Sequence, residues 1–308
     1  MITKGSRFGD EAPSSHVDIL VVGSINTDVT TYVDTLPEPG QTLHCNEIGF
    51  SLGGKGLNQA LAASITGARV VFAGAANSSD FDSIEGATRT TPNLVLDLEP
   101  VNEATGSAWI CVSNSSENFI VVNAGANHKI SSTFIDRCIN KYLPKIVMIQ
   151  GEISSDSNMH VATSCQRLGI PLCINPSPVR QEDASIVGLS SIVVVNKTEA
   201  GWIAGADLDS PQSALSFAES MVAGGKTVIV TMGDKGSVFA GPSRSGIIRS
   251  RQPETLRDTT GAGDRFAGVL CGWLSLGKDL ESALELASEA ASRLCEIPHA
   301  NELDFSRS

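Results

Sequence analysis

Short apolar runs alternate with longer stretches of helical periodicity through the second half of the chain. Apolar runs that end at polar residues are typical of buried strands, and apolar positions three or four residues apart indicate amphipathic helices. We therefore expect strands at 146–150, 171–175, 192–196 and 228–231, and helices at 131–142, 157–168, 199–204 and 212–223. Strands and helices in alternation form parallel sheets covered by helices. The pattern predicts a layered α/β/α domain with a mostly parallel sheet.

The first part of the chain begins in the same way and then leaves this rhythm. Strands are expected at 17–22 and 70–75, and three glycines open a helix over 52–68. The segments 29–51 and 105–123 are instead β-prone and interrupted by turn residues, and the second has the pattern of a hairpin. We expect them to form a small β-sheet lid on a single domain spanning 17–305, with a flexible tail at 1–16.

The composition narrows the class of protein. The 308 residues are 41% hydrophobic and 18% charged, as in a globular domain, and the net charge of −12 disfavours long nucleic acids and anionic membranes as partners. The seven cysteines form no C-x-x-C pair and the five histidines show no metal-ligand spacing, so we expect free thiols in the cytoplasm and no zinc site. The sequence also lacks a membrane-spanning apolar run and the apolar centre of a signal peptide.

Polar residues gather where the predicted strands end. They are Asn26 and Asp28 on a turn after the first strand, and then Gln150, Glu152, Asn175, Asn196, Glu199 and 231-TMGDKG-236. The carboxyl ends of parallel strands meet at one edge of a sheet, and ligands bind there. Separate caps and turns are the alternative, but so many polar groups at one edge favour a shared ligand site.

The glycine-rich stretch 258-DTTGAGD-264 leads directly into an apolar run with helical spacing. Glycines at a helix start let backbone N–H groups approach an anion, so this stretch is a candidate phosphate cradle with Asp264 in its rim. The alternative is that Asp264 is an ordinary N-cap residue. The residues alone leave both interpretations open. The common nucleotide signatures G-x-x-x-x-G-K-[ST] and G-x-G-x-x-G are missing, so any phosphate has to be bound by this loop.

Together these motifs resemble the ribokinase family of sugar kinases, over nearly the whole chain from about Asp18 to Asn301. The matching stretches are 23-GSINTD-28, 53-GGKGLN-58, 121-VVNAGAN-127, 150-QGE-152, 175-NPSP-178, 196-NKTE-199, 231-TMGDKG-236 and 258-DTTGAGD-264. Each stretch is short, but their shared order makes the resemblance specific. The lysine and the asparagine of 53-GGKGLN-58 resemble the residues found at these positions in the ribokinase branch of the family.

The resemblance implies a catalytic centre at Asp264. This residue would take the proton from the sugar hydroxyl that attacks the γ-phosphate of ATP. The backbone amides of Gly261, Ala262, Gly263 and Asp264 would form an anion hole for the charge on the transferring phosphoryl group. The sugar hydroxyls would be held by Asn26, Asp28, Gly54, Lys55, Asn58 and Glu152, together with Asp264. For Lys55 the alternative interpretation is a surface lysine.

The resemblance also implies a nucleotide site and two cation sites. The nucleotide would be lined by Asn196, Thr231, Gly233, Gly236, Gly263 and Ser288. Glu199 would hold Mg²⁺ through water, beside Asn196, as suits a cation that dehydrates reluctantly. An acidic residue that stabilises the first turn of a helix is an equally good interpretation of Glu199. Asp258 and the carbonyl oxygen of Thr260 would hold K⁺ beside the anion hole.

The chain departs from the family pattern in four places. The stretch 295-CEIPHAN-301 stands where a Thr and a Gly are usual, with His299 in place of the Gly. Ser288 stands where a His or an Asn is common, and 77-NSSDFD-82 replaces a Gly-Asp segment. Arg265 follows Asp264 where a small residue is usual, and it would either contact phosphate or point outward.

The implied function is the ATP-dependent phosphorylation of D-ribose at O5, by a cytoplasmic homodimer that pairs through its lids. A kinase for deoxyribose, another pentose or a nucleoside is one alternative. A non-catalytic relative that binds a sugar or a nucleotide is the other, and the altered C-terminal stretch motivates it. The implied ligands are the sugar, ATP, Mg²⁺ and K⁺, with no nucleic-acid or membrane partner.

Overall fold

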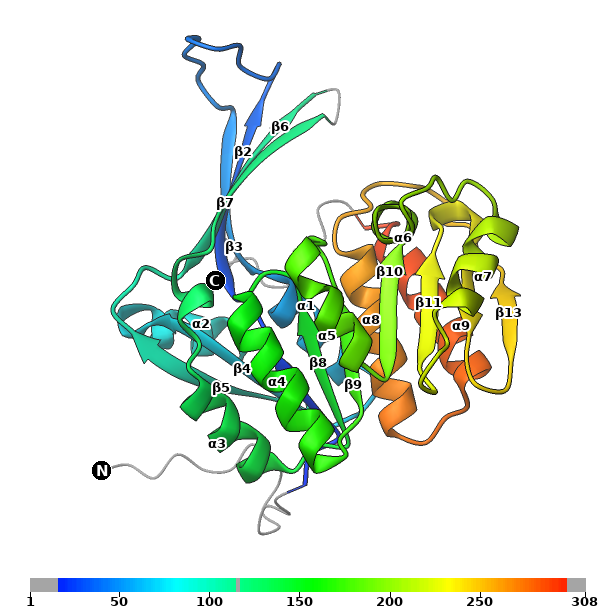
Figure 1. The fold of residues 1–308 in the computed structure, drawn as a ribbon. Helices are drawn as coiled ribbons and strands as arrows, with labels where there is room; N and C mark the ends of the chain where they lie inside the picture. The colour runs from blue at the N-terminus through cyan, green and yellow to red at the C-terminus, as the bar shows by residue number, and fades with distance from the viewer. Residues whose placement is uncertain (1–15, 115–116, 298–308) are drawn as a thin grey trace.

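The computed structural model describes residues 16–114 and 117–297, which form two separate sheets with helices packed on the larger one (Figure 1). The strands of the larger sheet are β1 (Ile19–Val22), β4 (Val70–Asn77), β5 (Leu94–Val101), β8 (Ile146–Gln150), β9 (Leu172–Asn175), β10 (Ile192–Asn196), β11 (Thr227–Thr231), β12 (Ser237–Ala240) and β13 (Ser245–Ile248). They follow the order β13-β12-β11-β10-β9-β8-β1-β4-β5. From β11 to β5 all neighbours are parallel, and β12 and β13 are added antiparallel. The predicted mostly parallel sheet is confirmed.

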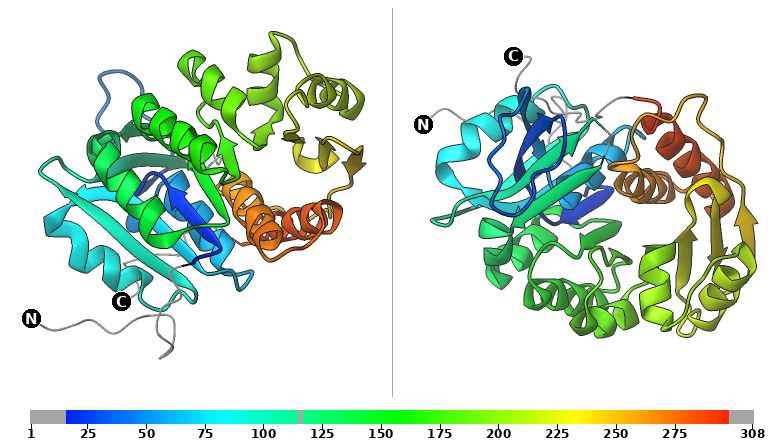
Figure 2. Two further views of the ribbon diagram at one scale, coloured as in Figure 1. Left: turned by 60° about the horizontal axis from the view of Figure 1, so that its bottom comes forward. Right: turned by 90° about the horizontal axis from the view of Figure 1, so that it is seen from above.

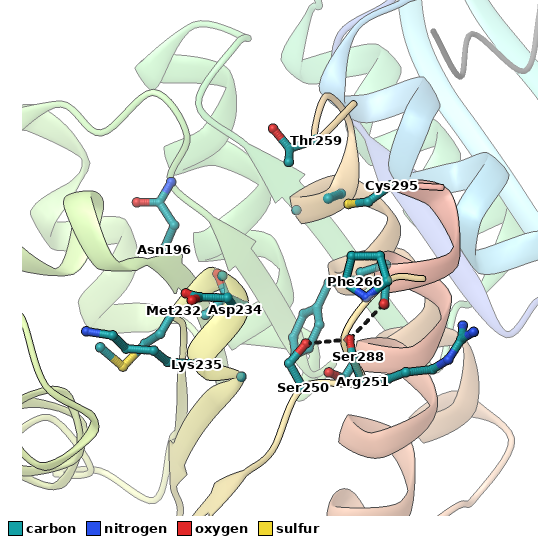
Figure 3. Close-up of a pocket in the computed structure, with 18 of the residues that line it drawn as sticks. Asn196, Met232, Asp234, Lys235, Ser250, Arg251, Thr259, Phe266, Ser288 and Cys295 are labelled. Carbon is teal, nitrogen blue, oxygen red and sulfur yellow. Dashed lines mark hydrogen bonds between the residues drawn. The ribbon is translucent and has the colours of Figure 1, made fainter. Parts of the chain in front are cut away.

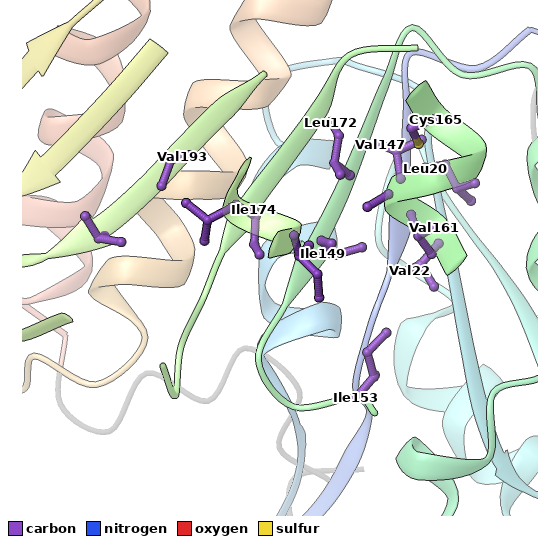
Figure 4. Packing of buried hydrophobic residues seen from close by; sticks show 14 of the residues in the cluster. Leu20, Val22, Val147, Ile149, Ile153, Val161, Cys165, Leu172, Ile174 and Val193 are labelled. Carbon is purple, nitrogen blue, oxygen red and sulfur yellow. The ribbon is translucent and has the colours of Figure 1, made fainter. Parts of the chain in front are cut away.

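Helices cover both faces of this sheet (Figure 2). One face carries α3 (Ser132–Tyr142), α4 (Ser155–Leu168), α5 (Ala184–Leu189), α6 (Lys197–Ala204) and α7 (Pro211–Ser220), and the other carries α1 (Lys55–Ser64), α2 (Phe81–Thr88), α8 (Ala262–Ser275) and α9 (Leu280–Leu294). Because side chains alternate along a strand, β1 contributes to both cores. Leu20 and Val22 pack with Val161 of α4 (Figure 4), whereas Ile19 and Val21 belong to the core formed with α1 and α8. The layered α/β/α prediction is confirmed.

The smaller sheet extends away from the main one (Figure 1). It consists of β2 (Asn26–Val33), β3 (Glu47–Gly53), β6 (Gly106–Ser113) and β7 (Asn118–Asn123), in the order β3-β2-β6-β7. Its strands come from the two β-prone segments that we expected to form a lid. Strands β2 and β6 are parallel although they come from distant parts of the chain, and each is flanked by an antiparallel partner.

The sequence pattern is wrong about the turn after the first strand. Asn26 and Asp28 lie on β2 itself, and only residues 23–25 separate β1 from β2. Asn26 is paired with Gly53 on one side and with Gly106 on the other. The two polar residues are therefore held by the backbone ladder of the small sheet.

Several elements differ from the sequence pattern or were not expected from it. The helix expected at 52–68 is confined to α1, because Gly54 has a left-handed φ of 93° and precedes the first helical residue. Strand β5 was hidden because it is half-exposed and contains Pro100, which a strand tolerates only at an edge. Among the described residues no helix is long and apolar enough to cross a membrane. The tail predicted at 1–16 lies outside the described residues except for His16.

Candidate active site

Asp264 is the third residue of α8 and is buried at the start of that helix. The N-cap position belongs to Gly261, whose φ of 76° is readily adopted by glycine. The interpretation of Asp264 as an N-cap is therefore wrong. Its Oδ1 accepts a hydrogen bond of 2.9 Å from Nε2 of Gln59, and its Oδ2 lies 3.9 Å from Nζ of Lys55. The carboxylate is thus aimed at side chains of α1, away from its own helix.

The backbone around Asp264 supplies part of the predicted anion hole. The first N–H groups of an α-helix lack carbonyl partners within the helix, and here they include those of Gly263 and Asp264. The N–H of Ala262 is used differently, because it donates to the carbonyl oxygen of Thr259 at 3.2 Å. Of the four predicted amides, those of Gly263 and Asp264 therefore point out of the helix start, as in any α-helix, whereas that of Ala262 is bonded within a turn.

Lys55 is the first residue of α1 and its side chain is 29% exposed. The negative charge of Asp264 is the largest cause of its raised pKa, burial opposes the shift, and Glu152 and Glu199 add to it. The ammonium group of Lys55 lies 3.9 Å from the buried carboxylate of Asp264, so the interpretation of Lys55 as a surface lysine is wrong. Asn58 follows one helical turn later on α1 and is half-buried.

Glu152 lies in the turn after β8 and reaches across to the start of α1. Its Oε2 accepts a hydrogen bond of 2.9 Å from the backbone N–H of Lys55 and one of 2.6 Å from Oγ of Ser24. Ser24 in turn accepts from the N–H of Gly56 at 3.2 Å. Glu152 therefore satisfies the first N–H group of α1 and Ser24 satisfies the second, and Ser24 is a contributor that the sequence did not reveal.

Asn26 and Asp28 approach the same region from the small sheet. Oδ1 of Asn26 accepts a 2.8 Å hydrogen bond from Nδ2 of Asn127, which was not predicted either. Asp28 is buried, and its Oδ1 has no hydrogen-bond partner in the part of the chain that the structure describes. Burial, with a smaller contribution from Glu152, raises the pKa of Asp28 to about 7, against a lowering by the backbone of Ala108. An unpartnered carboxylate oxygen is costly to bury, so a ligand hydroxyl is the natural partner for it.

On the opposite side of the α8 N-terminus lies a cavity of about 730 Å³ (Figure 3). Asn196 and Met232 line one wall of it, and Phe266 and Ser288 line the other. All the residues predicted to contact the nucleotide line this cavity: Asn196, Thr231, Gly233, Gly236, Gly263 and Ser288. Ala262 and Gly263 therefore border the cavity, while the side chain of Asp264 turns toward α1. The helix start therefore lies between this cavity, which is large enough for a nucleotide, and a group of polar side chains on its other side. We call this group the polar pocket; its residues are Asn26, Asp28, Lys55, Asn58, Glu152 and Asp264.

The comparisons with known proteins agree with this arrangement. Residues 17–303 match the profile of the pfkB family carbohydrate kinases. The chain belongs to this family. It is therefore a carbohydrate kinase that uses ATP, and the resemblance inferred from the motifs is confirmed.

Individual members of the pfkB family are similar over most of their length. A ribokinase of Mus musculus is 31% identical over 264 residues, which is 83% of this chain and 81% of the relative. A deoxyribokinase of Salmonella typhi is 28% identical over 278 residues, 88% of this chain and 90% of the relative. The structure of the Arabidopsis thaliana ribokinase complexed with ribose and ATP superposes with a TM-score of 0.81, at 25% identity, covering 92% of this chain and 93% of that one.

The predicted cation ligands of this family member are placed as follows. Asn196 and Glu199 form a capping box at the start of α6, with N–H to side-chain hydrogen bonds of 2.9 and 2.8 Å. The interpretation of Glu199 as a residue that stabilises the first turn of α6 is thus confirmed. Its Oε2 is the oxygen that accepts the hydrogen bond from the N–H of Asn196, so Oε1 is the oxygen that is left for a ligand. Asp258 Oδ1 accepts from the N–H of Thr260 at 2.8 Å. Within residues 16–114 and 117–297, no group of three or more His, Cys, Asp or Glu could hold a metal ion.

Three of the four departures from the family pattern lie around the same loop, whereas the fourth, 77-NSSDFD-82, lies between the end of β4 and the start of α2. The carbonyl oxygen of Cys295, just after α9, accepts hydrogen bonds from the N–H groups of Arg257 and Asp258 at 2.8 and 3.3 Å. Ser288 is buried on α9 at the wall of the cavity, and Arg265 is half-buried with a pKa lowered by that burial. His299 lies outside the described residues.

Proposed function

We propose that this carbohydrate kinase transfers the γ-phosphoryl group of ATP to O5 of D-ribose, giving ribose 5-phosphate and ADP. The observation that carries the proposal is the position of Asp264. Its carboxylate faces Gln59 and Lys55 of α1, and the preceding Gly263 borders the nucleotide-sized cavity. The sugar side is marked by Asp28, whose Oδ1 has no hydrogen-bond partner among the described residues.

Charged side chains lead from Asp28 to Asp264. The negative charge of Glu152 contributes to the raised pKa of both Asp28 and Lys55, and Nζ of Lys55 lies 3.9 Å from Oδ2 of Asp264. We expect a sugar held at Asp28 and Glu152 to place one hydroxyl beside the carboxylate of Asp264.

In the proposed reaction, the carboxylate of Asp264 accepts the proton of the O5 hydroxyl as this oxygen bonds to the γ-phosphorus. The bond between that phosphorus and the bridging oxygen of ADP breaks, and ADP leaves with the electron pair. We expect the amides of Gly261, Gly263 and Asp264 to stabilise the negative charge that grows on the phosphoryl oxygens, and Ala262 to join them if its turn hydrogen bond to Thr259 opens.

D-ribose is proposed as the acceptor because the polar pocket is dense in hydrogen-bonding groups. Its proposed ligands are Asn26, Asp28, Lys55, Asn58 and Glu152, with the close backbone of Gly54. A site that hydrogen-bonds a hydroxyl rejects an analogue without it, since buried polar groups are then left unpaired. The similar Arabidopsis protein has been seen with ribose and ATP, and the similar Salmonella protein is a deoxyribokinase, so 2-deoxyribose is the strongest alternative acceptor.

We further propose two cations in this reaction. Glu199 and Asn196 fit Mg²⁺ held through water, because both are already hydrogen-bonded to backbone groups and an all-protein cage is not formed by the described residues. Bound there, Mg²⁺ would neutralise charge on the phosphates of ATP. Asp258 and the carbonyl of Thr260 are the proposed K⁺ ligands, in the loop that leads into the anion hole.

We also propose a cytoplasmic homodimer that pairs through the small sheet. One face of that sheet carries exposed apolar side chains, which are Ile48, Phe50, Trp109, Phe119 and Val121. The register aligns Phe50, Val29, Trp109 and Val121 in one row across the four strands. A contiguous apolar face of this kind marks an interaction surface. None of the seven cysteines is in a disulfide, as a reducing compartment requires.

The decisive test is ADP release with Mg-ATP over a panel of acceptors: D-ribose, 2-deoxyribose, fructose and adenosine. We expect D-ribose to give the highest kcat/KM and phosphorus NMR of the product to show phosphate on C5. Each unpaired hydroxyl partner should cost about 1–3 kcal/mol, so 2-deoxyribose should be about 5–150-fold poorer. If another acceptor were turned over as well as D-ribose or better, the assignment of D-ribose as the substrate would be wrong. Binding of ribose or ATP without ADP release from any acceptor would establish the non-catalytic alternative.

A further inference from the structure

Gln59 is a fully buried amide at the centre of the polar pocket, on α1 one turn after Lys55. Its Nε2 donates to Oδ1 of Asp264 at 2.9 Å and to Oδ1 of Asn175 at 3.0 Å. Its Oε1 accepts from Nε2 of Gln150 at 2.8 Å. One side chain of α1 thus joins the start of α8 to the carboxyl ends of β8 and β9.

The orientation of the Gln59 amide follows from its neighbours. Nδ2 of Asn175 donates to the backbone carbonyl of Val194 at 2.8 Å, and a carbonyl can only accept. Asn175 must therefore present its Oδ1 to Gln59, and an oxygen there needs a donor. The NH₂ group of Gln59 has two hydrogens, one for Asn175 and one for Asp264. The carbonyl of Val194 on β10 thus fixes the orientation of the Asn175 amide, and Asn175 in turn fixes that of the Gln59 amide. As a result, the NH₂ group of Gln59 faces the carboxylate of Asp264.

This network treats the two oxygens of Asp264 differently. Oδ1 receives a neutral N–H from Gln59, and Oδ2 lies on the side of the Lys55 ammonium. The carboxylate is held in one rotamer, since a rotation would break the Gln59 hydrogen bond and leave a buried donor unpaired. A general base has to stay within hydrogen-bond reach of the proton it removes, and a misplacement of about 1 Å can cost about 100-fold in rate.

We infer that Gln59 is a positioning residue of this kinase: it occupies Oδ1 of Asp264 and thereby leaves Oδ2 as the oxygen that takes the proton from the sugar hydroxyl. The inference rests on the proposed role of Asp264 as the base. Gln59 itself touches neither the sugar nor ATP in this assignment. Its removal should therefore lower turnover without a comparable change in substrate affinity.

The test uses two variants of the whole protein, with D-ribose and Mg-ATP as substrates. Gln59→Met keeps the length of the side chain and removes its donor. Gln59→Glu keeps the shape, but it places acceptor oxygens against the oxygens of Asp264 and Asn175. We expect kcat to fall about 10–100-fold in both variants, with the KM of ribose and of ATP within about threefold of the parent. Wild-type kcat in folded Gln59→Glu would overturn the inference, and so would a loss confined to KM.

Asn158→Leu is the matched control, because Asn158 is also a fully buried amide but makes no hydrogen bond to Gln59 or Asp264 among the described residues. Its Nδ2 donates instead to the backbone carbonyl of Gln150 at 2.7 Å. We expect it to alter melting temperature but to leave kcat within about twofold, a range typical of a residue outside the site. An equal loss of kcat in Asn158→Leu would assign the effect to packing and overturn the inference.

A double-mutant cycle with Asp264→Asn separates this inference from the proposed function. If Gln59 acts through Asp264, Gln59→Met should cost little more in the Asp264→Asn background, because residues that act as one unit are not additive. Full additivity would overturn the inference while the base assignment stands. Near-parental turnover of Asp264→Asn alone would instead refute the proposed base, and the inference would fail with it.

Discussion

The ammonium group of Lys55 lies 3.9 Å from the carboxylate oxygen Oδ2 of Asp264, across the gap between α1 and α8. Both side chains are largely withdrawn from water, so neither charge has much solvent to stabilise it. Removing one partner of such a pair leaves the other charge uncompensated. The contact therefore ties the proposed base to the glycine-rich start of α1.

Lys55→Met should lower kcat/KM for ribose by about 10–100-fold, because it removes both a proposed sugar ligand and the counter-charge of Asp264. Steady-state kinetics with saturating ATP would measure the effect. Lys145→Met is a suitable control, since Lys145 also pairs with a buried aspartate, Asp18 at 2.8 Å, but lies at the opposite end of β8. An equal loss in both variants would mean that the effect of Lys55 is not specific to the site.

Asp264→Asn should reduce kcat by about 10²–10⁴-fold, as expected when a general base is removed. Affinities for ribose and ATP should change far less, because other side chains provide most of the proposed contacts. Helix α8 should remain folded, since Gly261 and not Asp264 occupies its N-cap. Kinetics, ribose titration and a melting curve on one preparation would check this, and near-parental turnover in a folded variant would contradict the assignment.

Asp28 should make the ligand-free protein less stable as the pH rises. Its folded-state pKa of about 7 exceeds the ordinary value of 3.8, so between these values the folded state binds more protons than the unfolded state. The free energy of unfolding should therefore fall across this window, by up to about 4 kcal/mol from this group at about 1.4 kcal/mol per pH unit. Above about pH 7 the contribution should be constant.

Asp28→Asn removes this titration, so the melting temperature of the variant relative to the parent should rise from pH 5 to pH 8. Its ribose affinity should nevertheless be lower, because an anionic acceptor is lost. Asp279→Asn is a useful control, since hydrogen bonds at the start of α9 lower the pKa of exposed Asp279, and its effect should be flat above pH 5. A relative melting temperature of Asp28→Asn that does not change between pH 5 and pH 8 would refute the prediction.

Trp109→Glu should convert the proposed dimer into monomers, because it places a charge in the centre of the apolar row on the small sheet. Trp109 is 61% exposed in the single chain. Light scattering coupled to size-exclusion chromatography would measure the mass. Trp202→Glu is the matched control, since Trp202 is 51% exposed but lies on α6. A parent protein that is monomeric at micromolar concentration would refute pairing through the lid.

K⁺ should raise kcat severalfold by ordering the loop from Asp258 to Gly261, which leads into the anion hole. Rates in KCl would be compared with rates in tetramethylammonium chloride at equal ionic strength. Asp258→Asn should weaken the dependence on K⁺. Identical rates in both salts would refute activation by K⁺ through this loop, which is joined to the altered stretch after α9 by the hydrogen bonds of Arg257 and Asp258 to the carbonyl of Cys295.

The main sheet was predictable because its central strands are buried on both faces and are read directly as apolar runs. Strand β8 matches its predicted bounds, and β10 does so as well. Strand β13 was not predicted, because its residues alternate between exposed and half-buried and it contains a glycine. The path of β2 was also hidden, since its pairing with β6 depends on residues about 80 positions away in the sequence.

The site was predictable as a set of residues but not as a set of contacts. The motifs identified Asp264, Lys55 and Glu152, and the structure brings them together. The same motifs could not show that Glu152 also satisfies the N–H of Lys55, or that one oxygen of Asp28 lacks a partner in the described part of the chain. Gln59 lies directly beside a recognised motif, but its significance depends on the carbonyl of Val194, which only the folded sheet brings near.

The short connection between β1 and β2 has a mechanical consequence. The N–H of Gly23 bonds to Ala73, the carbonyl of Ser24 accepts from Leu57, and the N–H of Ile25 bonds to Asn127. These hydrogen bonds fix the end of the small sheet that is nearest the main sheet. Any bending of the small sheet is therefore expected in its outer part, far from residues 23–25. We therefore expect the inner part, which carries Asn26 and Asp28, to keep its position relative to Asp264 when the outer part of the small sheet bends.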